Sequence, residues 1–380
     1  MIIAGFTIAV IYGILILYLS QGIDRLPSLE LKKQAHFNEF SIIIPFRNEA
    51  QNLLKLLGSL AAVKYPEDKY EIILIDDNSE DDSVVLAQEF TGDHPELNVK
   101  IIKLTEEHRA PKKAAIQKGI DASSFEWIIT TDADCSVPRK WLLAFNQMIN
   151  TEKAKMVVAP VTYEEGMSFL HQFQVLDFLS LQGITMGSFG QSDKGIILEP
   201  FLCNGANLCY SKEGFNAVHG FKGNEHLASG DDVFLMEKIQ EKYPNQVCFL
   251  KSYEALVKTS SQKSWRALLS QRIRWASKTT AYDSLKVKMI GLLVFAYSLL
   301  LIIFFFYGIA GKISWRSIGL IFLIKFNLDF LLIFKTSKFF KQTDILRSYF
   351  ISSFIHPFYT VIVSVLSLTK NYRWKERSYR

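Results

Sequence analysis

Two pairs of carboxylates stand where the sequence could support metal-assisted chemistry. Asp132 and Asp134 are one residue apart and follow a short apolar, β-branched run at 127–131. Asp231 and Asp232 are adjacent and precede another apolar segment. Carboxylate oxygens are the ligands that Mg²⁺ and Mn²⁺ prefer, and a lone carboxylate can act as a general base. Each pair could also be a solvated acidic turn or the acidic start of a helix.

The acidic pairs occur in a region that predicts alternating strands and helices. Apolar runs bounded by turn residues predict the strands, and helical periodicity predicts the segments between them. The expected strands are 40–45, 71–79, 99–104, 127–131 and 156–160, and the expected helices include 53–60 and 111–120. This alternation predicts an α/β fold with a mostly parallel sheet, in which ligands gather at the carboxyl ends of the strands.

The composition favours a protein that works at a membrane. Of the 380 residues, 49% are hydrophobic, and the mean hydropathy is +0.13. The net charge of +5 suits an anionic membrane face or a phosphorylated substrate. Basic residues are dispersed, so we expect no nucleic-acid partner. The four cysteines have no zinc-binding spacing and are expected to be free thiols in a reducing compartment.

Four apolar segments predict membrane helices. The first, 1–20, has no charged residue and approaches the length that spans a bilayer. It lacks the basic start and the cleavage site of a signal peptide, which is the alternative. Three further segments lie within 287–369. The middle one, 318–334, contains Lys325 and Asp329, whose i, i+4 spacing allows an ion pair that offsets part of the cost of burying them.

The expected domains follow from these segments. Basic residues after the first span place the region 38–280 in the cytosol, within a protein of the cell inner or plasma membrane. Its last part, 264–278, mixes Trp and Leu with Arg and predicts an amphipathic helix at the membrane interface. The basic tail 370–380 also favours the cytosol. Three full C-terminal spans would place it outside, so the C-terminal topology stays open.

Six short motifs occur in order between 40 and 278. They are PFRNE, DDNS, KKAAIQKG, DAD, GDD and QRIRW, which start at Pro45, Asp76, Lys112, Asp132, Gly230 and Gln271. In this order and at these intervals the chain resembles the family 2 glycosyltransferases of the GT-A fold. Its apolar flanks resemble those of the membrane-bound branch, which includes cellulose, chitin and hyaluronan synthases and ceramide glucosyltransferases.

The resemblance implies a nucleotide site and a metal site. Glu49 and Asp77 would bind the base and ribose of a nucleotide-sugar, and Lys112 would lie near its phosphates. Asp134 would be the principal ligand of Mg²⁺ or Mn²⁺. Asp132 would contact the ribose or the water shell of the metal. The metal would stabilise the departing nucleoside diphosphate as a Lewis acid.

The resemblance also implies a base and an acceptor site. Asp232 matches the general base of the family, but Asp231 stands where the family has Glu, so both remain candidates. The residues Gln271, Arg274 and Trp275 match the QxxRW motif. The arginine could bind the diphosphate in a bidentate manner, and the tryptophan offers an apolar face to a sugar ring.

These implications predict an inverting, metal-dependent glycosyltransferase, with a UDP-sugar as the expected donor. The small C-terminal membrane region favours a lipid or lipid-linked acceptor over a growing polysaccharide. Processive polysaccharide synthesis is the first alternative. A non-catalytic scaffold that binds a nucleotide-sugar and a nucleotidyltransferase are the others. A glycosyltransferase releases nucleoside diphosphate, a nucleotidyltransferase releases pyrophosphate, and a scaffold releases neither.

Overall fold

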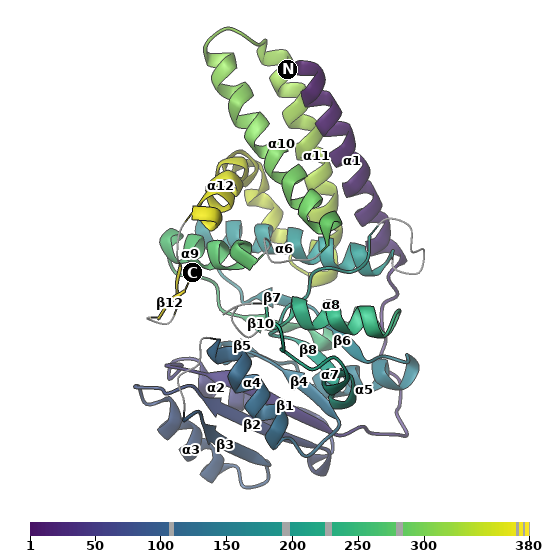
Figure 1. Cartoon of the computed structure of the whole chain (residues 1–380), viewed down its shortest axis with the longest axis vertical. Coiled ribbons are helices and arrows are strands. Elements are labelled where there is room, and N and C mark those ends of the chain that lie inside the picture. Colours follow the sequence, from purple (N-terminus) through teal and green to yellow (C-terminus); the bar gives the residue numbers. More distant parts are fainter. Residues whose placement is uncertain are drawn as a thin grey trace. The chain divides into compact units, whose positions relative to one another are not determined.

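The computed structural model describes residues 1–105, 110–191, 198–224, 230–278, 284–369, 372–374 and 377–379 (Figure 1). The chain forms two compact units. The α/β unit comprises Pro27–Glu164 and Phe201–Ser260. The helical unit comprises Met1–Leu26, Glu165–Pro200 and Ser261–Arg380. The chain therefore leaves the α/β unit after Glu164, returns to it at Phe201 and leaves it again after Ser260.

In the described part of the chain, seven strands form the main sheet of the α/β unit. They are β1 (Phe40–Phe46), β2 (Tyr70–Asp76), β3 (Val99–Lys103), β4 (Trp127–Thr130), β6 (Met156–Val158), β8 (Leu208–Ser211) and β9 (Val247–Phe249). Their order is β3-β2-β1-β4-β8-β6-β9. The four adjacent strands β3, β2, β1 and β4 are all parallel to one another. Strand β8 is antiparallel to its two neighbours, β4 and β6. The predicted α/β class with a mostly parallel sheet is confirmed.

The central strands are continuous apolar runs because both faces of the sheet are covered. The register pairs Phe40 with Tyr70 and Phe46 with Asp76, so β1 and β2 end at the same edge. Helix α4 packs closely on β1, since a Cβ added to Gly119 would lie 2.5 Å from Ile43 Cγ2. The sheet therefore brings its acidic loops to one edge, as the strand pattern predicts.

Helices and a small sheet complete the α/β unit. The helices are α2 (Leu53–Ala61), α3 (Ser83–Asp93), α4 (Pro111–Ala122), α5 (Trp141–Thr151), α7 (Lys212–Ala217) and α8 (Val233–Lys242). The small sheet consists of β7 (Val161–Tyr163), β10 (Val257–Thr259) and β5 (Cys135–Ser136). Strand β5 begins immediately after the predicted metal ligands, so it anchors the loop that carries them.

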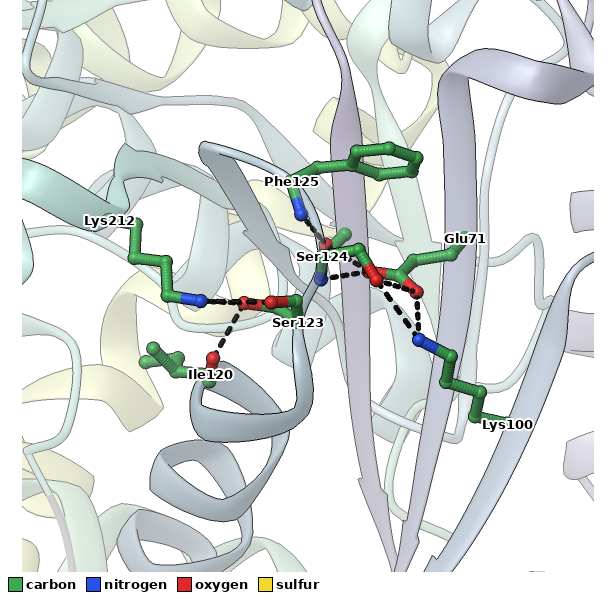
Figure 2. Close-up of polar contacts among 8 residues, drawn as sticks. Glu71, Lys100, Ile120, Ser123, Ser124, Phe125 and Lys212 are labelled. Carbon is green, nitrogen blue, oxygen red and sulfur yellow. Dashed lines mark hydrogen bonds and ion pairs between the residues drawn. The ribbon is translucent and has the colours of Figure 1, made fainter.

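A buried glutamate ties the amino ends of three strands together. Glu71 is fully buried and accepts hydrogen bonds from Ser41 Oγ, Lys100 Nζ and the backbone N–H of Ser124, each at 2.6 Å. Figure 2 shows the contacts of Lys100 and Ser124 with its carboxylate. Burial alone would raise the pKa of Glu71, but Lys100, Ser41 and Ser124 outweigh it and hold the pKa below its usual value.

The helical unit contains the long apolar helices. Its helices are α1 (Ile2–Arg25), α6 (Phe169–Phe189), α9 (Trp265–Ser277), α10 (Leu285–Ile309), α11 (Trp315–Phe340) and α12 (Tyr349–Thr369). Two short strands, β11 (Tyr372–Trp374) and β12 (Arg377–Tyr379), follow them. Among the described residues, four segments are long and apolar enough to cross a membrane: Ile2–Arg25, Leu285–Ile309, Trp315–Phe340 and Thr343–Leu368. They contain most of each predicted membrane segment.

Helix α6 has no counterpart among the predicted elements, and its backbone touches that of α1. A Cβ added to Gly190 would lie 1.9 Å from the carbonyl oxygen of Gly22. One added to Gly187 would lie 2.5 Å from the carbonyl oxygen of Leu19. Glycine is needed at these contacts because any side chain would push the two helices apart.

The predicted charge pair in the apolar helices is present and has a third partner. Lys325 and Asp329 of α11 form an ion pair, and Tyr12 of α1 donates a hydrogen bond to Asp329. The Lys325 ammonium also lies 5.1 Å from the centre of the Tyr12 ring. Lys325 is only 5% exposed. The pair therefore joins α1 to α11 in addition to reducing the cost of burying each charge.

Candidate active site

A lysine and two carboxylates meet just beyond the end of β4. Lys112 lies in the first turn of α4, Asp132 follows β4, and Asp231 precedes α8. Lys112 Nζ is 2.7 Å from Asp132 Oδ1 and 3.5 Å from Asp231 Oδ2. Three of the residues that the sequence selected from separate motifs thus form one cluster at the carboxyl edge of the sheet.

The charge of Lys112 is secured by its neighbours. Burial alone would lower the pKa of this lysine, but the charges of Asp132 and Asp231 outweigh that effect and raise it. Lys112 therefore stays protonated and balances part of the negative charge of the cluster. A compact cation in this position is suited to phosphate oxygens as well as to carboxylates.

Both oxygens of the Asp232 carboxylate are held by backbone donors. Oδ1 accepts a hydrogen bond from the N–H of Val233 at 2.8 Å, so Asp232 caps helix α8. Oδ2 accepts one from the N–H of Gly205 at 3.1 Å. The alternative interpretation of this pair as the acidic start of a helix also agrees with this geometry. The same contacts also fix the orientation of a carboxylate beside Asp231.

Gly205 is a site residue to which the sequence assigned no definite role. A Cβ added to it would lie 3.1 Å from Asp231 Oδ2 and 3.4 Å from Lys112 Nζ. Its carbonyl accepts a hydrogen bond from Thr130 Oγ1 at 3.0 Å. The absence of a side chain lets this backbone approach the charged cluster closely. Because these contacts are with residues far away in the chain, the sequence around Gly205 gives no sign of its role other than the glycine itself.

Asn207 holds the same segment in place from the other side. Its side chain is fully buried and donates hydrogen bonds to the carbonyls of Pro160 at 2.7 Å and Ala255 at 2.8 Å. Its Oδ1 accepts one from Trp141 Nε1 at 2.9 Å. These bonds make Asn207 a structural residue that ties the site segment to three other parts of the α/β unit.

The acidic loop after β4 carries two carboxylates, which are ligands of the type that Mg²⁺ prefers. Among the described residues, no three His, Cys, Asp or Glu side chains lie close enough together to hold a metal. A metal at Asp132 and Asp134 would therefore draw its other ligands from substrate oxygens and water, as Mg²⁺ usually does. Burial, with the nearby charges of Asp134 and Asp132, raises the pKa of the Cys135 thiol well above its usual value. A protonated thiol does not compete as a soft ligand.

The loops after β1 and β2 are tied to each other and carry Glu49 and Asp77. The guanidinium of Arg47 donates to the carbonyl of Asp77 at 3.0 Å, and the N–H of Asp77 donates to the carbonyl of Phe46 at 2.9 Å. The N–H of Glu49 donates to Ser83 Oγ at 2.8 Å. Both carboxylates thus lie in loops at the carboxyl ends of neighbouring strands, which is where the sequence predicts them.

The QxxRW motif lies in α9, which belongs to the helical unit. Arg272, inside the motif, donates from one terminal guanidinium nitrogen to Gln271 Oε1 at 2.6 Å. Its guanidinium carbon lies 4.2 Å from the centre of the Trp275 ring. The sequence selected Gln271, Arg274 and Trp275 but not Arg272. Arg272 nevertheless joins two of them.

The fold is that of the GT-A glycosyltransferases. A solved mannosyltransferase from Pyrobaculum calidifontis, PcManGT, matches with a TM-score of 0.58. The match covers 96% of each chain at 15% sequence identity, and it shows the fold alone. A mostly parallel sheet with acidic loops at one edge thus agrees with the class that the motifs predict.

The chain belongs to the family 2 glycosyltransferases. The model of glycosyl transferase family 2 matches residues 41–193, and that of glycosyl transferase family group 2 matches residues 127–360. The first match contains the loops of Glu49, Asp77 and Asp132. The second match contains Asp232, the QxxRW motif and the first two apolar helices after it, with part of α12. The predicted family is therefore confirmed.

Two relatives show how the similarity is distributed. The poly-β-1,6-N-acetyl-D-glucosamine synthase of Staphylococcus epidermidis is 25% identical over 357 residues, which cover 89% of this chain and 76% of that one. The dodecaprenyl-phosphate galacturonate synthase of Rhizobium johnstonii is 36% identical over 98 residues, which cover 25% of this chain and 28% of that one. Across four of the relatives that match less of this chain, the chain spans 25% to 54% of their length.

Proposed function

We propose that this protein is a membrane-bound, inverting glycosyltransferase that moves a sugar from a nucleotide-sugar to a lipid or lipid-linked acceptor. The cluster of Lys112, Asp132 and Asp231 beside the oriented Asp232 carries the proposal, because it supplies a phosphate-binding cation, metal-type oxygen ligands and a base together. Family membership supports the reaction class. Four long apolar helices support the location in a membrane.

In the proposed reaction, the acceptor hydroxyl attacks the anomeric carbon from the face opposite the leaving group. A new bond forms between the acceptor oxygen and this carbon. The bond from the carbon to the diphosphate oxygen breaks, and the nucleoside diphosphate leaves with the electron pair. Asp232 takes the proton of the hydroxyl, so the charges balance. Attack from the opposite face inverts the configuration of the sugar.

Other residues bind and orient the donor. Glu49 and Asp77 accept hydrogen bonds from the base and ribose. When the donor binds, the Lys112 ammonium forms ion pairs with its phosphates in place of those with Asp132 and Asp231. Asp134 and Asp132 would hold Mg²⁺ or Mn²⁺, which as a Lewis acid stabilises the charge of the departing diphosphate. The expected donor is a UDP-sugar. PcManGT was crystallised with GDP-mannose and Mn²⁺, so GDP-mannose belongs in the donor panel.

Processive synthesis of a polysaccharide is the second candidate. The observation that favours it is the alignment with the Staphylococcus epidermidis polysaccharide synthase over 89% of the chain. The relative that acts on dodecaprenyl phosphate matches only 25% of the chain. Against processive synthesis, only three long apolar helices follow the α/β unit in the described part of the chain. The length of the product distinguishes the two candidates.

The test is a donor and acceptor screen with purified protein. Release of nucleoside diphosphate is measured with a panel of nucleotide-sugars, with Mg²⁺, Mn²⁺ or a chelator, and with or without a bacterial lipid extract. Native protein is compared with Asp232→Asn, Asp231→Asn and the exposed control Asp93→Asn. We expect release that requires one donor, a divalent ion and the lipid, and that is lost in Asp232→Asn. The product should carry one sugar in inverted configuration.

Each other outcome identifies a specific error. Equal release by native protein and Asp232→Asn, with loss in Asp231→Asn, would move the base to Asp231. A long polymer would establish the second candidate. Pyrophosphate as the released product would mean a nucleotidyltransferase. Nucleotide binding without any release, across the whole panel, would mean a scaffold.

A further inference from the structure

Three helices of the helical unit meet at a buried charged cluster that the proposed reaction does not use. Asp177 of α6 accepts a hydrogen bond from Arg272 Nε of α9 at 2.7 Å, and its other oxygen lies 3.5 Å from His356 Nε2 of α12. The side chains of Asp177 and Arg272 are 11% and 5% exposed. The helices α6, α9 and α12 are labelled in Figure 1.

Stability alone is a weak reason for this cluster. Removing two charges from water costs about as much as their mutual attraction returns, so buried ion pairs often add little to stability. Burial would raise the pKa of Asp177, but Arg272 and His356 outweigh it and lower it. The aspartate is therefore ionised near neutral pH, and the hydrogen bond it accepts fixes where the guanidinium of Arg272 lies.

The fixed guanidinium of Arg272 in turn contacts two side chains of the QxxRW motif, those of Gln271 and Trp275. It is planar and rigid, so anchoring Nε at Asp177 also fixes its other nitrogens and its faces. One terminal nitrogen donates to Gln271 Oε1 at 2.6 Å, which directs the side-chain N–H groups of Gln271 elsewhere. The guanidinium carbon is 4.2 Å from the centre of the Trp275 ring. Phe178, next to Asp177, contacts the same ring with 6.0 Å between ring centres.

We propose that Asp177 and Arg272 are positioning residues of the sugar-transfer reaction, which set the side chains of Gln271 and Trp275 without touching the substrate. The inference rests on the proposed function and on the acceptor site that the family resemblance implies for Gln271 and Trp275. His356 adds a contact from α12, so three helices must be in place for the motif to be ordered. Asp177 and Arg272 should therefore affect binding of the acceptor and not binding of the nucleotide-sugar donor.

The test separates the acceptor from the donor. Asp177→Asn, Arg272→Gln and the double variant are compared with Arg266→Gln, an exposed arginine of the same helix. We expect each single variant to raise the KM for the acceptor at least tenfold, while nucleotide affinity in titration calorimetry stays within twofold of native. The double variant should be no worse than either single one, because both act through one contact. Arg266→Gln should behave as native.

A second substitution distinguishes geometry from charge. Arg272→Lys keeps the positive charge but loses the planar fork. Positioning predicts that it fails to restore the acceptor KM, whereas a role in charge balance predicts that it does. The proposal would be overturned if Arg272→Lys had a native KM for the acceptor. It would also be overturned if the single variants lost nucleotide affinity as much as acceptor affinity, or if the effects of Asp177→Asn and Arg272→Gln were additive in the double variant.

Failure of the proposed function can be told apart from failure of this inference. If the native protein transfers no sugar from any donor, the proposed function is wrong. Contact between Arg272 and Trp275 is then tested by thermal unfolding of Arg272→Gln, Trp275→Ala and the double variant. Non-additive shifts in melting temperature support an Arg272 that orders Trp275, and additive shifts refute it.

Discussion

Lys112 Nζ lies 2.7 Å from Asp132 Oδ1, so the cation of one predicted motif is bound to the carboxylate of another. The two residues come from α4 and from the loop after β4. Their contact means that the positive charge of Lys112 is neutralised by carboxylates of the same site. Binding of a diphosphate and a divalent ion would give each partner a new counter-charge.

Replacing Lys112 should therefore impair the site without unfolding the protein. In Lys112→Met, the carboxylates of Asp132 and Asp231 lose their counter-charge, and the phosphates lose a cation. We expect kcat/KM for the donor to fall on the order of 100-fold. Lys118→Met, an exposed lysine on the same helix, is the matched control. Native activity in Lys112→Met would exclude a role of this lysine in catalysis.

Gly205 should not tolerate even a methyl group. In Gly205→Ala the new Cβ would lie 3.1 Å from Asp231 Oδ2 and 3.4 Å from Lys112 Nζ, so the Asp231 carboxylate must move by a few tenths of an ångström within the cluster beside Asp232. We expect a loss of kcat on the order of tenfold or more, since small displacements of catalytic groups are costly. Melting temperature should change little.

The control for this substitution is Gly58→Ala, on the exposed face of α2, where nothing lies within 4 Å of the added Cβ. It should keep native activity and gain slightly in stability. Native turnover in Gly205→Ala would show that catalysis does not depend on this position of the Asp231 carboxylate.

Glu71 should make stability depend on pH. Its folded-state pKa lies below its usual value, so its contribution is fully present above the unfolded-state pKa of about 4.3. The contribution is lost as the pH falls through the lower, folded-state pKa. Glu71→Gln should cost about 2 kcal/mol near neutral pH, because an amide cannot accept all the bonds that the carboxylate accepts.

Melting temperatures of native protein, Glu71→Gln and the exposed control Glu89→Gln, measured across pH, test this prediction. The difference in melting temperature between native protein and Glu71→Gln should become smaller as the pH falls below the unfolded-state pKa of Glu71. A gap that stays constant or widens with acidification contradicts the assignment. Glu89→Gln should follow the native curve throughout.

The folded protein should lose more stability when the Asp329 carboxylate is removed than when the Tyr12 hydroxyl is removed. Tyr12→Phe removes one donor to Asp329 and should cost about 1 kcal/mol or less. Asp329→Asn leaves Lys325 buried without its counter-charge and should cost about 3 kcal/mol. Melting temperatures in detergent rank the two, with the exposed Tyr307→Phe as control. The reverse ranking would show that Lys325 is solvated in the folded protein.

The sequence predicts those parts of the fold whose signals are local. Each central strand of the main sheet is an apolar run, and Glu49, Asp77 and Asp132 come shortly after such runs. Contacts such as Lys112 with Asp231 were not predictable from spacing, because they depend on how the strands are ordered in the sheet. The roles of Glu49, Asp134 and Arg274 came from family resemblance and stay predictions.

Helix α6 shows why the rest was missed. Its buried residues include His171, Gln174 and Gln182 as well as apolar ones, so no apolar stripe at helical spacing marks one face. Arg272 finds its partner Asp177 at a distance of 95 residues along the chain, and no pattern within α9 reveals it. Packing on several sides of one helix erases the periodicity on which sequence interpretation depends.

The interrupted path of the chain has a consequence for biosynthesis. The helical unit is assembled from Met1–Leu26, Glu165–Pro200 and Ser261–Arg380. During translation, α1 therefore leaves the ribosome long before α11, which carries the partner of Tyr12. The backbone contact between α1 and α6 can form first, and α10 to α12 complete the unit last. A shortened chain of residues 27–260 would keep α6 but lose every helix against which it packs.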